Sequence, residues 1–493
     1  MMVTTKARVD KRTRARRTGP PATGRQRRST HVEHLSRTER VAKGKAARTA
    51  VPLDAQAAFE PSPARDPVGL LLDQSRSRVP ELVPIRYGRM LVSPFAFYRG
   101  AALPMAADLA AMPSSGLTVQ LCGDAHASNF GAFASPARRL VFDINDFDET
   151  LPGPFEWDVK RLAASLVVAA RENGYSPKAG RMVTVAAAES YRTAMRAFAG
   201  QTRIEVWYAH LEVEPTLRRY RAQMKPKRIA WVQAAVSKAH THDSLQELSK
   251  LTTVVDGRHQ IVDMPPTIVP VEDVVTDVQA DALYKEIETV LARYRRNLQS
   301  DRRRLLEHFR LVQVARKVVG VGSVGTQAWI LLLDGGDGDE PLFLQAKEAD
   351  VSVLARFCGA SRYSNQGERV VAGQHLIQAQ SDIFLGWTRI EQPDGQPRDY
   401  YVRQLRDWKF SVPIEQMRPK GLADYAEMCG WTLARAHARS GDRVALASYL
   451  GKKKTFAHAI ADFAESYADQ NDRDYAAFND AVKEHRVEAE VGV

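Results

Sequence analysis

The sequence predicts an α+β protein with two lobes, a large helix-rich lobe and a smaller lobe built on an antiparallel sheet. Residues 119–310 combine two short strands with long stretches of helical apolar periodicity. Residues 311–410 differ in character, because short apolar strands alternate there with Asp/Gly turns typical of hairpins. The chain has 493 residues, enough to form two or more lobes around separate cores.

The net positive charge is confined to residues 1–50. The chain has 70 Lys and Arg residues, of which 15 lie in this segment, and 58 Asp and Glu residues, of which 3 lie there. The rest of the chain therefore carries 55 positive and 55 negative side chains. We expect a disordered, solvated tail, because this segment is poor in apolar residues and cannot offset its ordering entropy. Weak contact of the tail with nucleic acid or another anionic surface is the alternative. No aromatic residue interleaves its basic residues, which disfavours a stacking site.

Cysteine usage and hydropathy exclude other classes of protein. Cys122, Cys358 and Cys429 are far apart, so we expect neither a disulfide framework nor a Cys-x-x-Cys metal site. No apolar run reaches about 18 residues, the length of a membrane-spanning helix. Arg16 and Arg17 are not followed by an apolar segment, so no secretory signal is predicted. We expect a cytoplasmic protein without a membrane span, and the sequence leaves its oligomeric state open.

The predicted elements follow one another in a simple order. An N-terminal extension that packs on the large lobe precedes two strands, each of which runs into a polar loop. In the first part of the chain the bounds are 51–118 for the extension, 119–122 and 140–142 for these strands, 156–173, 180–250 and 278–310 for helices of the large lobe, and 252–275 for a connector. The small lobe has strands at 311–350 and 383–406 and a helix at 367–380. A C-terminal segment at 411–493, helical from 422 to 483, completes the large lobe.

The first polar loop contains Asp124 and Asn129, which four residues separate. This is the spacing of the catalytic loop in phosphotransferases. There a carboxylate accepts or orients the proton of the attacking hydroxyl, and a nearby amide oxygen holds a magnesium ion. The spacing alone often arises by chance, so the prediction depends on the motif that follows.

The second polar loop is acidic. Asp146 follows a short strand, which is where a phosphotransferase needs its second magnesium ligand. With Asp143, Asp148 and Glu149 it makes four carboxylates within seven residues, which would repel one another without cations nearby. The loop therefore predicts a metal site, with an acidic surface turn as the alternative. The sequence leaves open which of Asp143, Asp146 and Asp148 dominates metal binding.

Together these motifs resemble those of aminoglycoside and choline phosphotransferases, a branch of the protein-kinase-like fold. The resemblance rests on Gly123–His126 with Asn129, on Ile144–Phe147, and on Gly153–Asp158. Residues 86–100 and this core also resemble a bacterial family catalogued as domain of unknown function 2252. That second resemblance covers nearly the whole chain but implies no substrate.

The phosphotransferase resemblance implies a role for each matching residue. Asp124 would be the catalytic base, Asn129 and Asp146 would hold Mg²⁺, and Asp158 would be structural. His126 would bond to backbone or phosphate within the catalytic loop. A metal-binding role for His126 is disfavoured, because no second histidine lies nearby in the sequence.

A glycine-rich segment lies downstream of these motifs. Gly320, Gly322 and Gly325 form the pattern G-x-G-x-x-G, which occurs both in phosphate-covering loops and in dinucleotide-binding sites. A dinucleotide site needs a helix to begin there, so that its N-terminus faces pyrophosphate. Thr326–Leu333 is strand-like instead, which favours a hairpin over the phosphates of ATP. The dinucleotide interpretation is the alternative.

The next strand ends on Lys347, which we expect to contact the α- and β-phosphates. Glu368, in the helix predicted at 367–380, is the expected partner of this lysine, with Glu348 as the nearby alternative. A solvated lysine at a strand end is the alternative for Lys347.

The order of these segments is rotated relative to protein kinases. Tyr400–Leu405 fits a hinge strand beside the adenine, and Gly430–His437 fits the helix that usually leads into the catalytic loop. We therefore predict a circularly permuted kinase-like fold, in which Lys347 faces Asp146 across a cleft although the chain reaches it last.

The predicted function is transfer of a phosphoryl group from ATP, with Mg²⁺, to a hydroxyl of a small molecule. Nucleotidyl transfer on the same fold and a non-catalytic kinase-like binding protein, whose tail recruits an anionic partner, are the alternatives. The acceptor cannot be read from the sequence. Its pocket is expected within residues 63–118 and 176–310, which carry no recognisable motif.

Overall fold

The computed structural model describes residues 34–220, 237, 248, 250–255, 258–273, 277–318, 324–336, 340–391, 397–405, 408 and 410–492. The helices of the N-terminal half are α1 Arg37–Ala50, α2 Pro67–Ser75, α3 Val83–Met90, α4 Pro94–Gly100, α5 Ala102–Ala110, α6 Phe155–Glu172, α7 Pro177–Gly200, α8 Arg203–Tyr208 and α9 Val213–Tyr220. Those of the C-terminal half are α12 Asp277–Asn297, α13 Ser300–Leu306, α14 Ala355–Cys358, α15 Gln366–Ile377, α16 Pro419–Ser440, α17 Arg443–Leu450 and α18 Thr455–Lys483.

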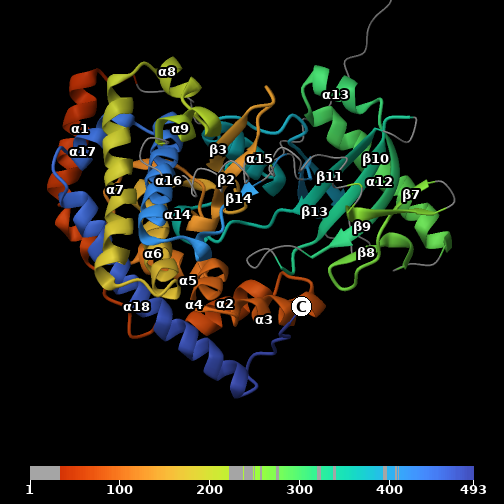
Figure 1. Cartoon of the computed structure of the whole chain (residues 1–493), viewed down its shortest axis with the longest axis horizontal. Helices are drawn as coiled ribbons and strands as arrows, with labels where there is room; N and C mark the ends of the chain where they lie inside the picture. Colours follow the sequence, from red (N-terminus) through yellow and green to blue (C-terminus); the bar gives the residue numbers. More distant parts are fainter. Residues whose placement is uncertain are drawn as a thin grey trace, which may run out of the picture. The chain divides into compact units, whose positions relative to one another are not determined.

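The strands form small antiparallel sheets, which together with the helices confirm the α+β prediction (Figure 1). They are β1 Thr118–Leu121, β2 Phe130–Ala134, β3 Leu140–Ile144, β4 Leu151–Pro154, β5 Leu211–Glu212, β6 Thr252–Val255, β7 Arg258–Ile261, β8 Ile268–Pro270, β9 Arg310–Lys317, β10 Ala328–Asp334, β11 Pro341–Glu348, β12 Gly386–Glu391, β13 Pro397–Gln404 and β14 Phe410–Ser411. No helix among the described residues combines the length and the apolar character that crossing a bilayer requires.

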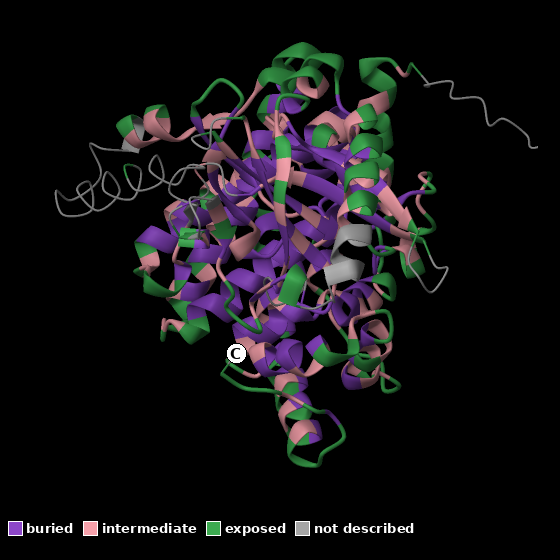
Figure 2. Cartoon of the chain, turned by 90° about the vertical axis from the view of Figure 1, so that its right-hand side faces the viewer, coloured by how far each residue is buried: buried purple, intermediate pink, exposed green. Residues whose placement is uncertain are grey.

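The largest hydrophobic core lies between helices α6, α7, α16 and α18, which pack side by side (Figure 1). Helix α6 is buried on nearly all sides. Figure 2 shows that the helices in the interior carry the colour of buried residues. Helices α7 and α16 approach closely at Gly430, where a Cβ atom would lie 2.1 Å from the carbonyl oxygen of Ala187. Glycine is therefore required at this crossing.

The six-stranded sheet has the order β12-β13-β11-β10-β9-β8, and all its neighbours are antiparallel. Leu331 of β10 lies opposite Leu344 of β11, and both belong to a second hydrophobic core against α12. Helix α15 connects β11 to β12 through the chain, and its N-terminus is capped by the side chain of Asn365. Alternating apolar residues thus fix which face of the sheet packs on the helix.

Two small sheets bring the polar loops together. Strands β1 and β4 pair so that Leu121 lies opposite Leu151, and β2 pairs with β3. The loop after β1 and the loop after β3 therefore leave these sheets close to each other. The backbone N–H of Asn145 donates to the carbonyl oxygen of Asn129 at 2.9 Å and joins the two loops directly.

Two expectations from the sequence are wrong within the described residues. Residues 37–50, expected in the disordered tail, form helix α1, which packs closely on α17 through the buried Gly44. Residues 1–33 lie outside the described residues. The expected connector at 252–275 contains the β6–β7 hairpin and β8, which extends the six-stranded sheet. In both places packing partners far along the chain stabilise an element that local composition does not favour.

Candidate functional site

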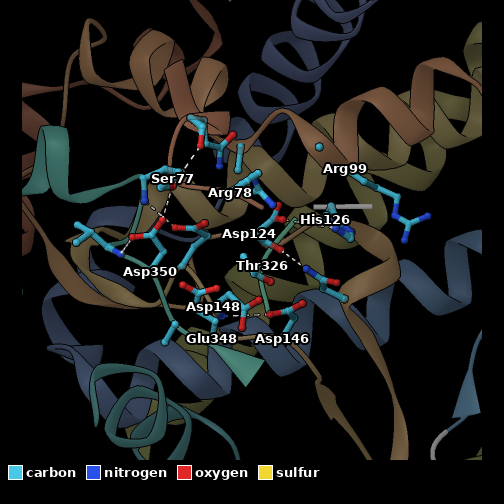
Figure 3. Close-up of a pocket in the computed structure, with 18 residues that line it drawn as sticks. Ser77, Arg78, Arg99, Asp124, His126, Asp146, Asp148, Thr326, Glu348 and Asp350 are labelled. Atoms are coloured by element: carbon cyan, nitrogen blue, oxygen red, sulfur yellow. Dashed lines mark hydrogen bonds and ion pairs between the residues drawn. The ribbon is translucent and has the colours of Figure 1, made fainter. Parts of the chain in front are cut away.

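A cavity of about 140 Å³ opens where the two polar loops, the sheet and the N-terminal helices meet (Figure 3). Asp124, His126, Asn129 and Asp146, all predicted from the sequence, line it together. The other lining residues are Gln74, Ser77, Arg78, Arg99, Gly100, Ala102, Asp148, Glu149, Thr326, Glu348, Ala349, Asp350, Val351 and Val353. Residues of α2, α4 and α5 and of the segment after α2 form one wall, so part of the segment 63–118 lines the cavity. None of the described residues within 176–310 lines the cavity.

Asp124 is held by an arginine that the sequence analysis did not identify. Nε of Arg161, on α6, donates to Oδ1 of Asp124 at 2.8 Å, and an Nη of the same guanidinium donates to the carbonyl oxygen of Tyr98 at 2.8 Å. Burial raises the pKa of Asp124 above its usual value, although Arg161 and Arg99 counteract this effect. One oxygen of Asp124 is thus fixed by the ion pair, while Oδ2 lies 3.7 Å from Nε2 of His126. Oδ2 is the oxygen left for an incoming hydroxyl.

Asn129 presents its amide oxygen to the cavity. Its Nδ2 donates to the carbonyl oxygen of Asp124 at 2.8 Å, which fixes the orientation of the amide. The side-chain oxygen of Asn129 accepts no hydrogen bond from any residue that the structure describes. Asn129 therefore has a free oxygen ligand beside the carboxylate of the same loop.

The three aspartates of the acidic loop have different environments. Asp143 is fully buried in an ion pair with Arg435, on α16, and has a structural role. Asp148 accepts from Tyr401 at 2.7 Å and pairs with Lys347. Asp146 accepts the backbone N–H of Asp148 through Oδ1 at 3.1 Å, and burial together with the charge of Asp148 raises its pKa. Asp146 is the best placed of the three to bind a cation.

Lys347, at the end of β11, lies at the same site as the acidic loop, 199 residues earlier in the chain. It is buried, with 4% of its surface exposed. Burial alone would lower the pKa of Lys347. The charges of Asp148, Tyr401 and Asp146 raise this pKa by more than burial lowers it, so the ammonium stays charged. The predicted pairing with Glu368 is not formed, because Asp148 takes this position. Glu348, the alternative partner, pairs with Arg398 at 2.8 Å.

Asp158 has the structural role that the resemblance implied. Its carboxylate accepts the backbone N–H groups of Cys122 at 2.8 Å and Gly123 at 3.1 Å, just before Asp124. Nε2 of His437, on α16, lies 3.2 Å from the same carboxylate, and Tyr191 holds the other ring nitrogen at 2.8 Å. The buried carboxylate therefore anchors the start of the catalytic-type loop to two helices.

His126 is buried in the cavity wall and electrically neutral. Burial, together with the charges of Arg99 and Arg161, lowers its pKa well below the usual value. Its Nδ1 is buried and has no hydrogen-bond partner among the described residues. The bond to backbone or phosphate that the resemblance implied for His126 stays a prediction.

The glycine-rich segment is described only in part. Gly320 and Gly322 lie outside the described residues, and Gly325 has a φ of +92°, a conformation that favours glycine. A strand, β10, follows this turn and not a helix, so the dinucleotide-binding interpretation loses its geometric basis. The carbonyl oxygen of Gly325 accepts the backbone N–H of Val79 at 2.8 Å, which attaches the turn to the N-terminal helices.

Arg78, Arg99 and Arg161 are the site residues that the motifs did not reveal. They come from helices α4 and α6 and from the segment after α2, whose packing no local pattern specifies. One signal existed for Arg161, since it falls within the apolar helical pattern of residues 156–173. A charged residue at such a position requires a buried partner.

The donor groups fit a magnesium ion better than a structural metal. Within the described part of the chain, no three His, Cys, Asp or Glu side chains gather as metal ligands. Asp146 and Asn129 supply two oxygen donors. Mg²⁺ is commonly bound by one or two carboxylates and takes its other ligands from water and substrate phosphates. The site therefore suits Mg²⁺ bound together with a phosphate compound.

Comparison with known proteins gives one match. Residues 78–481 match the sequence model of a bacterial family described as "Uncharacterized protein conserved in bacteria (DUF2252)". Neither the curated proteins nor the solved structures contain a match to this chain. The matched residues include the two polar loops, the six-stranded sheet and the C-terminal helices up to α18. The chain belongs to this family, domain of unknown function 2252.

Proposed function

We propose that the protein transfers the γ-phosphoryl group of ATP, with Mg²⁺, to a hydroxyl of a small molecule. One observation supports this most strongly. Asp124, Asn129 and Asp146 line one cavity, and Lys347, paired with Asp148, lies at the same place from a distant segment. A base, two metal-binding oxygens and a phosphate-binding lysine are the groups that phosphoryl transfer requires.

The connectivity of the chain supports a circularly permuted kinase-like fold. A glycine turn, the lysine-bearing strand β11, helix α15 and strands β12 and β13 follow one another before α16. The end of α16 then returns to the start of β1, where the hydroxyl of Ser440 accepts the backbone N–H of Gln120 at 3.1 Å. The helix that precedes the catalytic loop in protein kinases would thus reach this loop through space instead of through the chain.

In the proposed reaction Asp124 positions the acceptor and removes its proton. The acceptor oxygen forms a bond to the γ-phosphorus while the bond from this phosphorus to the β–γ bridging oxygen breaks. The electron pair of the broken bond leaves with ADP, and the proton of the hydroxyl moves to Oδ2 of Asp124. Arg161 keeps Oδ1 of Asp124 occupied, so that Oδ2 points to the acceptor.

The remaining residues hold the nucleotide. Asn129 and Asp146 would hold Mg²⁺, which supplies charge neutralisation for the β- and γ-phosphates. Lys347 would exchange its contact with Asp148 for the α- and β-phosphates. Because these groups are positioned before the reaction, the contribution of the protein is mainly orientation and electrostatics.

Product analysis tests the reaction. The protein is incubated with γ-labelled ATP, Mg²⁺ and the small-molecule fraction of a bacterial lysate, and the products are separated. We expect ADP and labelled small molecules from the wild type and from Asp480→Asn, an exposed control on α18, and at least 100-fold less transfer from Asp124→Asn. Release of pyrophosphate would favour nucleotidyl transfer. Equal transfer by Asp124→Asn would contradict the role of the base, and no turnover at all would favour a non-catalytic binding protein.

A further inference from the structure

Arg99 is a half-buried cation without a hydrogen-bonded or ion-paired partner among the described residues. It lies in the last turn of α4 and lines the cavity. No residue that the structure describes forms a side-chain hydrogen bond or ion pair with it, and its Nε is buried without a partner. A partly buried charge without a hydrogen-bonded counter-ion is unfavourable, and an anion bound to the guanidinium would reduce this cost.

The other arginines at the cavity are already engaged. Arg161 pairs with Asp124, and Arg78 donates to the carbonyl oxygen of Val324 beside the glycine turn. Arg78 therefore stands on the side where the nucleotide phosphates are expected. Arg99 differs from both, because its guanidinium has no such contact.

The position of Arg99 places it on the acceptor side. Its charge lowers the pKa of both Asp124 and His126, and Figure 3 shows Arg99 next to His126 among the residues that line the cavity. The accepting hydroxyl must lie next to Asp124, since this carboxylate takes its proton. An anion bound by Arg99 therefore belongs to the molecule that carries this hydroxyl.

His126 gives a second, independent observation on the same side. Its Nδ1 is buried with no hydrogen-bond partner among the described residues, and only 5% of the side chain is exposed to solvent. Buried polar atoms are nearly always hydrogen-bonded, and an exception at a cavity indicates a missing ligand or water. Two unsatisfied polar groups thus stand together beside the proposed base.

We propose that the acceptor is a small hydroxyl compound that also carries a phosphate or carboxylate group, and that Arg99 binds this group. The inference rests on the proposed function and names the substrate class of the same site. A guanidinium matches both anions with two parallel hydrogen bonds. Anchored in this way, the compound presents its hydroxyl to Oδ2 of Asp124, and the anionic group itself is unchanged by the transfer.

Calorimetric titration with defined probes tests this inference. The protein is first saturated with Mg²⁺ and a non-hydrolysable ATP analogue, then titrated with glycerol 3-phosphate, glycerate, glycerol or choline. We expect the wild type to bind at least one of the two anionic probes and neither glycerol nor choline. Arg99→Gln should bind the anionic probes at least tenfold more weakly. Arg76→Gln is the matched control, because Arg76 is exposed outside the cavity and should change nothing.

Separate outcomes distinguish the two sources of an anion. If Arg99→Gln weakens binding of Mg·ATP and not of the anionic probes, Arg99 serves the nucleotide phosphates and the proposal is overturned. Binding of glycerol or choline equal to that of the anionic probes, or no binding of any probe by the wild type, would also overturn it. If the wild type does not bind Mg·ATP, the proposed function fails, and titration of the anionic probes without nucleotide still tests Arg99.

Discussion

Lys347 of β11, which is buried, forms an ion pair with the half-buried Asp148 of the acidic loop across 199 residues of sequence. The pair connects the six-stranded sheet to the polar loops of the helical region. Removing Asp148 would leave the buried charge of Lys347 without its ion-pair partner, whereas removing Lys347 leaves a half-buried carboxylate. The contact therefore has one consequence for stability and another for the proposed binding of Mg·ATP.

Lys347→Met should lower the free energy of unfolding by about 1–2 kcal/mol, because the half-buried Asp148 then loses its counter-ion but keeps the hydrogen bond from Tyr401. The double variant Lys347→Met/Asp148→Asn should recover part of this stability and none of the affinity for Mg·ATP. Urea denaturation of the four proteins in the cycle measures the first effect, and calorimetry the second. Full stability in Lys347→Met would contradict the structural role of the pair.

Arg161 should act on turnover through the orientation of Asp124. Arg161→Lys keeps a positive charge but loses the planar contact that also reaches the carbonyl oxygen of Tyr98. We expect kcat to fall about 100-fold, since a misplaced base loses its alignment, while the KM for ATP stays within about twofold. Steady-state kinetics with varied ATP measures both. A change in KM alone would assign Arg161 to nucleotide binding.

The sequence revealed the parts of the site that local patterns encode. Asp124, Asn129 and Asp146 could be predicted because loops of fixed spacing follow recognisable strands. Lys347 could be predicted because it ends a strand after a glycine turn. The partner of Lys347 could not be predicted, because Glu368 is close to Lys347 in the sequence whereas Asp148, the actual partner, is close only in space.

Long-range packing explains what the sequence did not reveal. Arg99 belongs to a short helix whose position depends on its contacts with α3, α6 and α18. Helix α1 was missed because its basic, apolar-poor composition does not show that Gly44 lies against α17. The six-stranded sheet gained β8 for the same reason, since a three-residue strand carries too little pattern of its own.

Lys160 should weaken the native state at neutral pH. It is buried on α6, over the ring of Phe463 at 4.6 Å, and burial lowers its pKa from 10.5 to about 8. Below pH 8 both states are protonated and the native state bears the full cost of the buried charge. Between about pH 8 and 10.5 the native state releases its proton before the unfolded state does, so stability should rise with pH.

Lys160→Met should therefore be more stable than the wild type at pH 7. We expect a gain of up to about 3 kcal/mol in the free energy of unfolding, reduced by the energy of the lost cation–π contact with Phe463. The difference should shrink as the pH rises from 8 to 10.5. Urea denaturation of both proteins across this range measures it. A variant that is less stable at pH 7 and shows no dependence on pH would contradict this account.

Gly430 tests the crossing of α7 and α16 that positions Asp158 and His437. Gly430→Ala would place a methyl group 2.1 Å from the carbonyl oxygen of Ala187, so the helices must separate. We expect a loss of about 1–3 kcal/mol in stability. Gly200→Ala, in the last residue of α7, is the control, because nothing lies within 4 Å of its added Cβ. Thermal unfolding compares them, and equal midpoints would show that the crossing is looser than described.

Binding of Mg·ATP tests the central claim most directly. Isothermal titration calorimetry of the wild type, Asp146→Ala and the exposed control Asp480→Asn, each with and without Mg²⁺, isolates the metal-dependent part of the affinity. We expect the wild type and Asp480→Asn to bind ATP only with Mg²⁺, and Asp146→Ala to bind at least tenfold more weakly, because an oxygen ligand of the metal is lost. Binding by Asp146→Ala equal to that of the wild type, or no binding by the wild type, would contradict the proposed site.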